Sequence, residues 1–295
     1  MTEPITSAIN PRRGSAQFVL ACCCAYVFAA LWHAKPLHAE PAMMSVLYAP
    51  QPGQWVHTAS LGYYDTAYAV RSRVLNHDGH SRYGLVGYGL DYGLTHATTL
   101  SVVQIYAKQL ESNPNNVAQG RVGWRSPKFQ VSHIHELGGH WWVKPTGGVQ
   151  LSPATSSGMN YVFGAVDVAY RLAQTQPTWT VAAGLIRTEH KDIDGHSQGW
   201  RIEANWEQGH HHLKLKRAET RLSELFGAQG HYDPSRYVTT ELEWAYRWKP
   251  KMWLSIGYVH ETNRGRLVQM PTTLEFRSDR QHQQVTASIA WGINP

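Results

Sequence analysis

Side chains alternate between apolar and polar along much of the chain, with a period of two residues. In one segment the apolar set is Val86, Tyr88, Leu90, Tyr92 and Leu94, and the positions between them are Gly87, Gly89, Asp91 and Gly93. The same alternation occurs around Trp200, around Leu242 and from Val285 to Ile293. Because successive side chains of a β-strand point to opposite faces, this period predicts strands with one apolar and one polar face.

Two kinds of all-β protein alternate in this way: soluble sandwiches and barrels that span a membrane. The chain has 12 Trp and 15 Tyr but only 6 Phe, and its aromatic residues recur near the ends of the apolar faces. That placement is typical of the aromatic girdles at the two interfaces of a membrane, whereas a sandwich would have to pack these large rings together in its core. We assign to the girdles Trp55, Tyr88, Tyr92, Trp200, Trp206, Trp244, Trp248 and Trp291.

The polar faces carry charges of both signs. A charge that faces the middle of a bilayer costs roughly 2–4 kcal/mol, so we predict that these faces point into the barrel. The predicted lumen-lining residues are Asp91, Arg201, Glu203, Glu207, Lys214, Lys216, Glu241, Glu243 and Arg247. They form either a polar path for solutes or a network of paired charges that fills a narrow interior.

The spacing of these segments predicts an antiparallel, up-and-down transmembrane β-barrel of about 12 strands. The predicted strands are 54–66, 82–94, 98–109, 117–126, 141–151, 160–173, 178–189, 198–208, 211–221, 236–248, 252–262 and 283–293. Short connections alternate with longer ones at 67–81, 190–197, 222–235 and 263–282, as expected of periplasmic turns and extracellular loops. The exception is 127–140, which falls where a short turn belongs and includes a further candidate strand, Phe129–Glu136.

The N-terminal residues have the pattern of a secretory signal peptide. Arg12 and Arg13 precede the apolar run Phe18–Leu31, which is too short to span a bilayer, and a cleavage site follows at Ala39. We therefore divide the chain into a signal peptide at 1–39, a periplasmic N-terminal segment at 40–53 and a barrel domain at 54–295. The three cysteines are Cys22, Cys23 and Cys24, so the mature chain is expected to have no thiol.

With this signal peptide, the run Tyr88–Thr95 before a tight turn and the terminal strand Val285–Ile293, the chain resembles Gram-negative outer-membrane β-barrel proteins, including transporter-like members of uncertain substrate. The resemblance covers about residues 50 to 295. It implies residence in the bacterial outer membrane, with outer-membrane lipids, lipopolysaccharide and the barrel-assembly machinery as partners. The leading functional prediction is a narrow channel or transporter-like conduit for small polar solutes.

A second hypothesis is a lipid-active hydrolase in the outer membrane. The segment Gly257–Arg266 is similar to the His-x-Ser-Asn motif of outer-membrane phospholipases and lipid A deacylases, with Thr262 in place of the serine. The candidate catalytic residues are His260, Thr262 and Asn263, of which the first two share the predicted lipid-facing side with Ile256. A hindered secondary hydroxyl is a poor nucleophile without a dedicated base and oxyanion site, so a barrel without enzymatic activity is favoured.

Other functional classes receive less support from the residues. A structural or adhesive barrel would act through its loops at 67–81, 222–235 and 263–282. Imidazole binds copper, zinc and nickel, but the candidate ligands match no fixed spacing, and we predict no metal or other cofactor. These candidates are His133, His135, His190, His196 and His211. The formal net charge of +6 comes without a basic run or a nucleic-acid-binding motif, so nucleic acid is not an expected partner.

Overall fold

The computed structural model describes residue 43 and the ranges 45–74, 76–112, 123–151, 160–172, 177–191, 195–223, 225–227, 230–269 and 274–293. Within these ranges, no helix is long and apolar enough to cross a membrane. The strands are β1 (Trp55–Arg71), β2 (Asn76–Gly93), β3 (Thr98–Ser112), β4 (Gly123–Trp124), β5 (Lys128–His133), β6 (His135–Gly138), β7 (Trp141–Gln150), β8 (Tyr161–Arg171), β9 (Thr178–His190), β10 (Gly195–Gln208), β11 (His211–Leu222), β12 (Leu225–Gly227), β13 (Gly230–Lys249), β14 (Met252–Gln269) and β15 (Leu274–Ile293).

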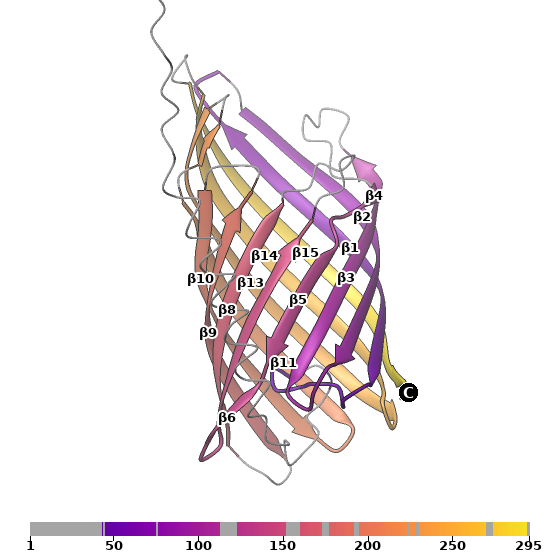
Figure 1. Ribbon diagram of the computed structural model, residues 1–295. Coiled ribbons are helices and arrows are strands. Elements are labelled where there is room, and N and C mark those ends of the chain that lie inside the picture. Colours follow the sequence, from indigo (N-terminus) through magenta and orange to yellow (C-terminus); the bar gives the residue numbers. More distant parts are fainter. Residues whose placement is uncertain are drawn as a thin grey trace, which may run out of the picture.

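The strands form one antiparallel sheet that closes on itself. Each strand pairs with the next in the order β1, β2, β3, β5, β7, β8, β9, β10, β11, β13, β14 and β15, and β15 returns to pair with β1. The short strands β4, β5 and β6 share one position in the wall between β3 and β7, and β12 pairs only with β13 among the described strands. The result is a closed barrel with twelve strand positions (Figure 1), which confirms the predicted fold class and strand number.

Alternate side chains point to opposite faces of this wall. On β9, Thr178, Thr180 and Ala182 are buried, whereas Trp179 and Val181 are each 44% exposed. Apart from β12, each of the other strands also has at least one exposed, large apolar side chain on the outward face. A wall that is apolar outside and polar or small inside is the arrangement of a barrel that spans a membrane.

Tight turns join the strands at the end of the barrel where β1 begins and β15 ends. His140, Gly209 and Lys251 lie in three of these turns with φ angles of 70°, 59° and 63°. Positive φ angles suit such turns because they match the right-handed twist of the strands on either side. We call this the short-turn end and the opposite one the long-loop end. In bacterial barrels the short turns are periplasmic.

Several strands extend farther toward the long-loop end than predicted. β1 continues to Arg71 and β2 begins at Asn76, so most of the loop expected at 67–81 is strand. β13, β14 and β15 contain 20, 18 and 20 residues, although a membrane-crossing strand needs only about 9–11. The loops expected at 222–235 and 263–282 are therefore largely strand, as is the described part of 190–197. The five long strands β1, β2, β13, β14 and β15 form a tall wall on one side of the barrel (Figure 1).

Of the strand predicted at 117–126, the structure describes only the last four residues. Residues 113–122 lie outside the described part of the chain, and of the remainder only β4 is strand. The fourth position in the wall is filled mainly by β5 and β6, inside the region where a turn was expected. The alternative strand at Phe129–Glu136 is therefore the better interpretation, although it is broken between β5 and β6.

Candidate functional site

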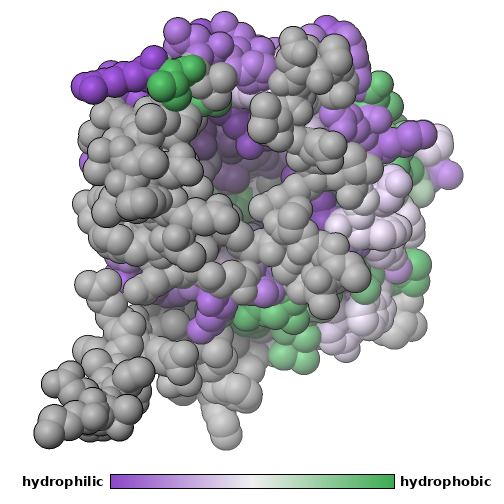
Figure 2. Space-filling view, turned by 90° about the horizontal axis from the view of Figure 1, so that it is seen from above, coloured by the Kyte–Doolittle hydropathy of each residue, from purple (hydrophilic) through white to green (hydrophobic). Residues whose placement is uncertain are grey.

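The candidate site is the lumen of the barrel. All nine predicted lumen residues lie on the inner face of the wall. On β10, β11 and β13 this face is marked by Asn205, His212 and Ala245, each of which is 0% exposed. On β2, Asp91 lies on the same face as the buried Tyr83. Figure 2, which looks into the long-loop end, shows a hollow whose visible walls are mainly hydrophilic. The polar faces of the strands thus surround a central space.

The neighbouring strands β11 and β13 carry a ladder of paired charges on this inner face. The register opposes Lys214 to Glu243 and Lys216 to Glu241 on β11 and β13. Lys214 Nζ lies 2.9 Å from Glu241 Oε1 and also pairs with Glu243, while Lys216 Nζ lies 3.0 Å from Glu241 Oε2. On β10, Glu203 Oε1 accepts a hydrogen bond of 2.8 Å from the side chain of Asn205. The charges of opposite sign therefore compensate one another along the wall.

A second ion pair crosses β9 and joins β8 to β10. Arg201 binds both carboxylate oxygens of Asp167, with Nε 2.6 Å from Oδ1, and Asp167 is 2% exposed. Gly184 on β9 lies between them in the register, and its missing side chain leaves room for the pair. Sequence reasoning missed Asp167, although a single carboxylate within the apolar run Tyr161–Tyr170 has to face inward.

The N-terminal segment, Met43 with Ser45–Gln54, crosses the short-turn end of the lumen. Leu47 is 2% exposed and packs in a cluster with Ile134, which links β5 to β6, and with the inward-facing residues Trp142 on β7, Ala169 on β8 and Ala182 on β9. Met43 packs against an opposing part of the wall, Ala245, Trp253 and Ala290 on β13, β14 and β15. The indigo segment lies across the lower end of the barrel in Figure 1.

The side chain of Lys144, which points into the lumen, holds the middle of this segment. Lys144 Nζ on β7 donates a hydrogen bond of 2.8 Å to the carbonyl oxygen of Val46. Lys144 lies opposite Asp167 in the register, so the segment is joined to the charge network of the wall. The region predicted as a periplasmic N-terminal segment at 40–53 therefore belongs, in its described part, to the lumen itself.

The predicted girdle residues all lie on outward positions, but at different heights. Most of them lie close to the short-turn end, where the rings of Trp55 and Tyr92 are 4.5 Å apart and Trp291 stacks on His57. Trp206, Trp244 and Trp248 belong to the same end, whereas Tyr88 and Trp200 lie farther along their strands. Most of the eight assigned aromatic residues therefore lie at one membrane interface, the one near the short-turn end.

The candidate catalytic residues do not share one face of the wall. In the register His260 opposes Thr240 and Thr262 opposes Val238, on the outward side with exposed Ile256. Asn263 opposes Tyr237 and lies on the inward side. The histidine and threonine are therefore separated from the asparagine by the wall of the barrel, which does not favour their joint action.

The candidate metal ligands are dispersed. His133 is buried and hydrogen-bonds Thr98 at 2.9 Å, with the ring of His135 6.5 Å away, and both lie near the short-turn end. His190 and His196 lie on opposite faces at the long-loop end, and His211 stacks on Trp244 outside the wall. Among the described residues, no group of three or more His, Cys, Asp or Glu side chains is placed to hold a metal ion.

Comparison with known proteins identifies the fold and not a family. No protein-family model matches the chain, and no curated protein matches its sequence. Among solved structures, an outer-membrane channel from Pseudomonas putida F1 is similar with a TM-score of 0.54 and 12% identity, over 87% of this chain and 100% of that chain. The NanC porin gives a TM-score of 0.45 and 8% identity over 78% of this chain and 98% of that one. The KdgM porin gives a TM-score of 0.41 and 9% identity over 77% of this chain and 98% of that one. The chain has the fold of the Gram-negative outer-membrane β-barrels.

Proposed function

We propose that the protein is an outer-membrane channel for small polar solutes. The observation that carries the proposal is a closed wall with an apolar exterior and charged side chains on its inner face. Closure removes every free strand edge from the lipid, and the polar inner face offers hydrogen-bonding partners to a passing solute. Residence in the outer membrane is reached, in this proposal, after cleavage of the signal peptide at Ala39.

The pairing of the lumen charges favours solutes that carry little net charge. Lys214, Lys216 and Arg201 each have a carboxylate partner on the wall. A ring of unpaired like charges would select ions of one sign, whereas paired charges present dipoles to either sign. We therefore expect weak ion selectivity and passage of neutral or zwitterionic polar molecules.

The N-terminal segment narrows the path at the short-turn end. Its contacts with two parts of the wall place it across the route that a solute would take toward the periplasm. It is attached to β1 at one side and is held by the hydrogen bond from Lys144, by backbone hydrogen bonds of Gly53 and Gln54 with Gly93, and by apolar contacts. Release of this segment would widen the pore without breaking any strand pairing.

Planar-bilayer recording tests the channel. The wild-type protein is compared with a variant that lacks residues 43–50, and heat-dependent migration in a denaturing gel confirms that both are folded. We expect discrete conductance steps, with larger steps or a greater open fraction in the deletion variant. A flat trace from both folded proteins at every applied voltage would refute the channel.

A further inference from the structure

A groove on the outer face of the barrel differs from the rest of the lipid-facing wall. It has a volume of about 600 Å³ and lies over β8, β9, β10 and β11. Its apolar part is formed by Val166, Leu185 and Trp200, whose side chains are 49%, 69% and 38% exposed. Gly164 adds no side chain, which helps to leave the groove hollow. Its size is within the range of about 300–1,000 Å³ that small-molecule sites occupy.

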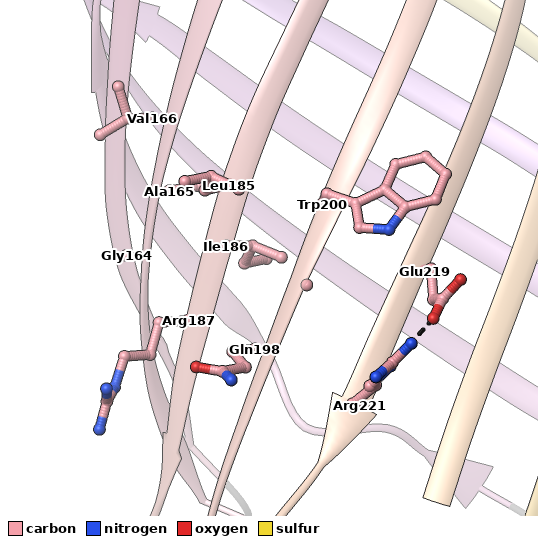
Figure 3. Close-up of a pocket in the computed structure, with 11 residues that line it drawn as sticks. Gly164, Ala165, Val166, Leu185, Ile186, Arg187, Gln198, Trp200, Glu219 and Arg221 are labelled. Carbon is pink, nitrogen blue, oxygen red and sulfur yellow. Dashed lines mark hydrogen bonds and ion pairs between the residues drawn. The ribbon is translucent and has the colours of Figure 1, made fainter.

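Polar residues border the groove on the side of the long-loop end. Arg187, Gln198 and Arg221 are one step nearer that end than Val166, Leu185 and Trp200 on the same or neighbouring strands. Figure 3 shows these three polar side chains on one side of Trp200, with Val166 and Leu185 away from them. The groove is therefore amphipathic, with the apolar part toward the middle of the membrane.

The two arginines belong to a longer row. The cross-strand register connects Arg187, Gln198, Arg221, Arg236 and Arg264 in order, and we call its four arginines the arginine row. All four side chains are well exposed, at 46%, 71%, 58% and 81%. Neighbouring strands are about 4.8 Å apart, so the row spans roughly 20 Å of the wall.

Carboxylates compensate the arginine row incompletely. Glu189 pairs with Arg187 at 2.7 Å, and Asp279 pairs with Arg264 at 3.6 Å. Glu219 is shared between Arg221 at 3.0 Å and Arg236 at 2.7 Å. Among the described residues, the four guanidinium groups thus share three carboxylate partners. The arginine row therefore has an excess of positive charge that attracts an anion.

From this placement we propose that the groove and the arginine row bind lipopolysaccharide through its lipid A part. An acyl chain lies in the groove against Leu185 and Trp200, and the phosphate groups pair with Arg187 and Arg221. Guanidinium groups suit phosphate because they donate two parallel hydrogen bonds. A row of arginines fits a head group with more than one phosphate better than a single phosphodiester. The site depends on the outer-membrane orientation proposed above but not on conduction.

The experiment measures lipid binding to the mature protein refolded in detergent without lipopolysaccharide. Native mass spectrometry follows the binding of bisphosphorylated lipid A, dephosphorylated lipid A and phosphatidylglycerol, with inorganic phosphate as a competitor. We expect lipid A to bind most tightly, and the double variant Arg187→Gln/Arg221→Gln to bind it at least tenfold more weakly. The matched control is Arg71→Gln, which changes an exposed outward arginine on β1 and is expected to bind as the wild type does.

Leu185→Gln separates the two parts of the site, because it weakens the acyl contact and leaves the arginines in place. Weaker lipid A binding by this variant supports the groove. The proposal is overturned if dephosphorylated lipid A binds as tightly as the phosphorylated form, or if Arg71→Gln weakens binding as much as the double variant. Displacement of lipid A by an equal concentration of inorganic phosphate also overturns it, since the site would then hold a free anion.

Discussion

Leu47 is the residue whose truncation tests whether the N-terminal segment closes the pore. It is 2% exposed and packs against Ile134, Trp142, Ala169 and Ala182. Leu-to-Ala substitutions at buried sites cost about 2–5 kcal/mol, and a cost of about 2–3 kcal/mol suits a segment that lies in the lumen and becomes solvated when it is released. Since about 1.4 kcal/mol is a factor of ten, Leu47→Ala should shift the equilibrium toward the released segment by about 30- to 150-fold.

Single-channel recording measures this shift as the fraction of time spent in the high-conductance state. The matched control is Leu61→Ala, which removes the same atoms from an outward side chain that is 66% exposed. We expect a rise in the open fraction for Leu47→Ala and none for Leu61→Ala. If Leu47→Ala and the deletion of 43–50 both conduct as the wild type does, the segment does not govern the pore and the reasoning from burial fails.

Three further outcomes follow from the same contacts. Lys214→Met leaves Glu241 and Glu243 without their shared cation, so we expect a loss of roughly 2–4 kcal/mol in the free energy of unfolding, measured in urea, with recovery in Lys214→Arg; an unchanged midpoint would contradict the ladder. Glu241→Gln frees positive charge in the lumen and should move the reversal potential in a salt gradient toward anion selectivity; a shift toward cations would count against it. The mature chain is expected to have no cysteine, so Leu47→Cys/Ala182→Cys should form an intrachain disulfide detectable by gel mobility, and failure to form under oxidation would place the segment elsewhere.

The sequence predicted the part of the barrel that lies in the membrane better than the part outside it. Within the bilayer one face meets lipid, so apolar and polar residues must alternate, and eleven of the twelve strand positions could be assigned from that period. Toward the long-loop end, at Ala67–Arg71 and Asn76–Ser81, both faces of the strands meet water, so apolar and polar residues need not alternate and the sequence does not reveal the strands. The strands continue there because backbone pairing does not depend on apolar side chains.

The charged part of the candidate site could also be anticipated, because a charge costs too much on the lipid side. The docking of the N-terminal segment could not. The contact between Lys144 and Val46 joins residues 98 positions apart, and Met43 reaches strands at the other end of the chain. No local pattern in the segment indicates which inner wall its side chains will contact.

The seam of the barrel is made by its first and last strands, β1 and β15, which pair along their length from Trp55 with Ile293 to Arg71 with Arg277. Closure therefore has to wait until β15 is available to β1, whatever other strands have already paired. Contacts between such distant positions form slowly, and until they do, the apolar exterior and two free edges are available for wrong partners. The protein thus passes through an exposed stage on its way to the membrane, and a chain shortened at its C-terminus would remain at that stage.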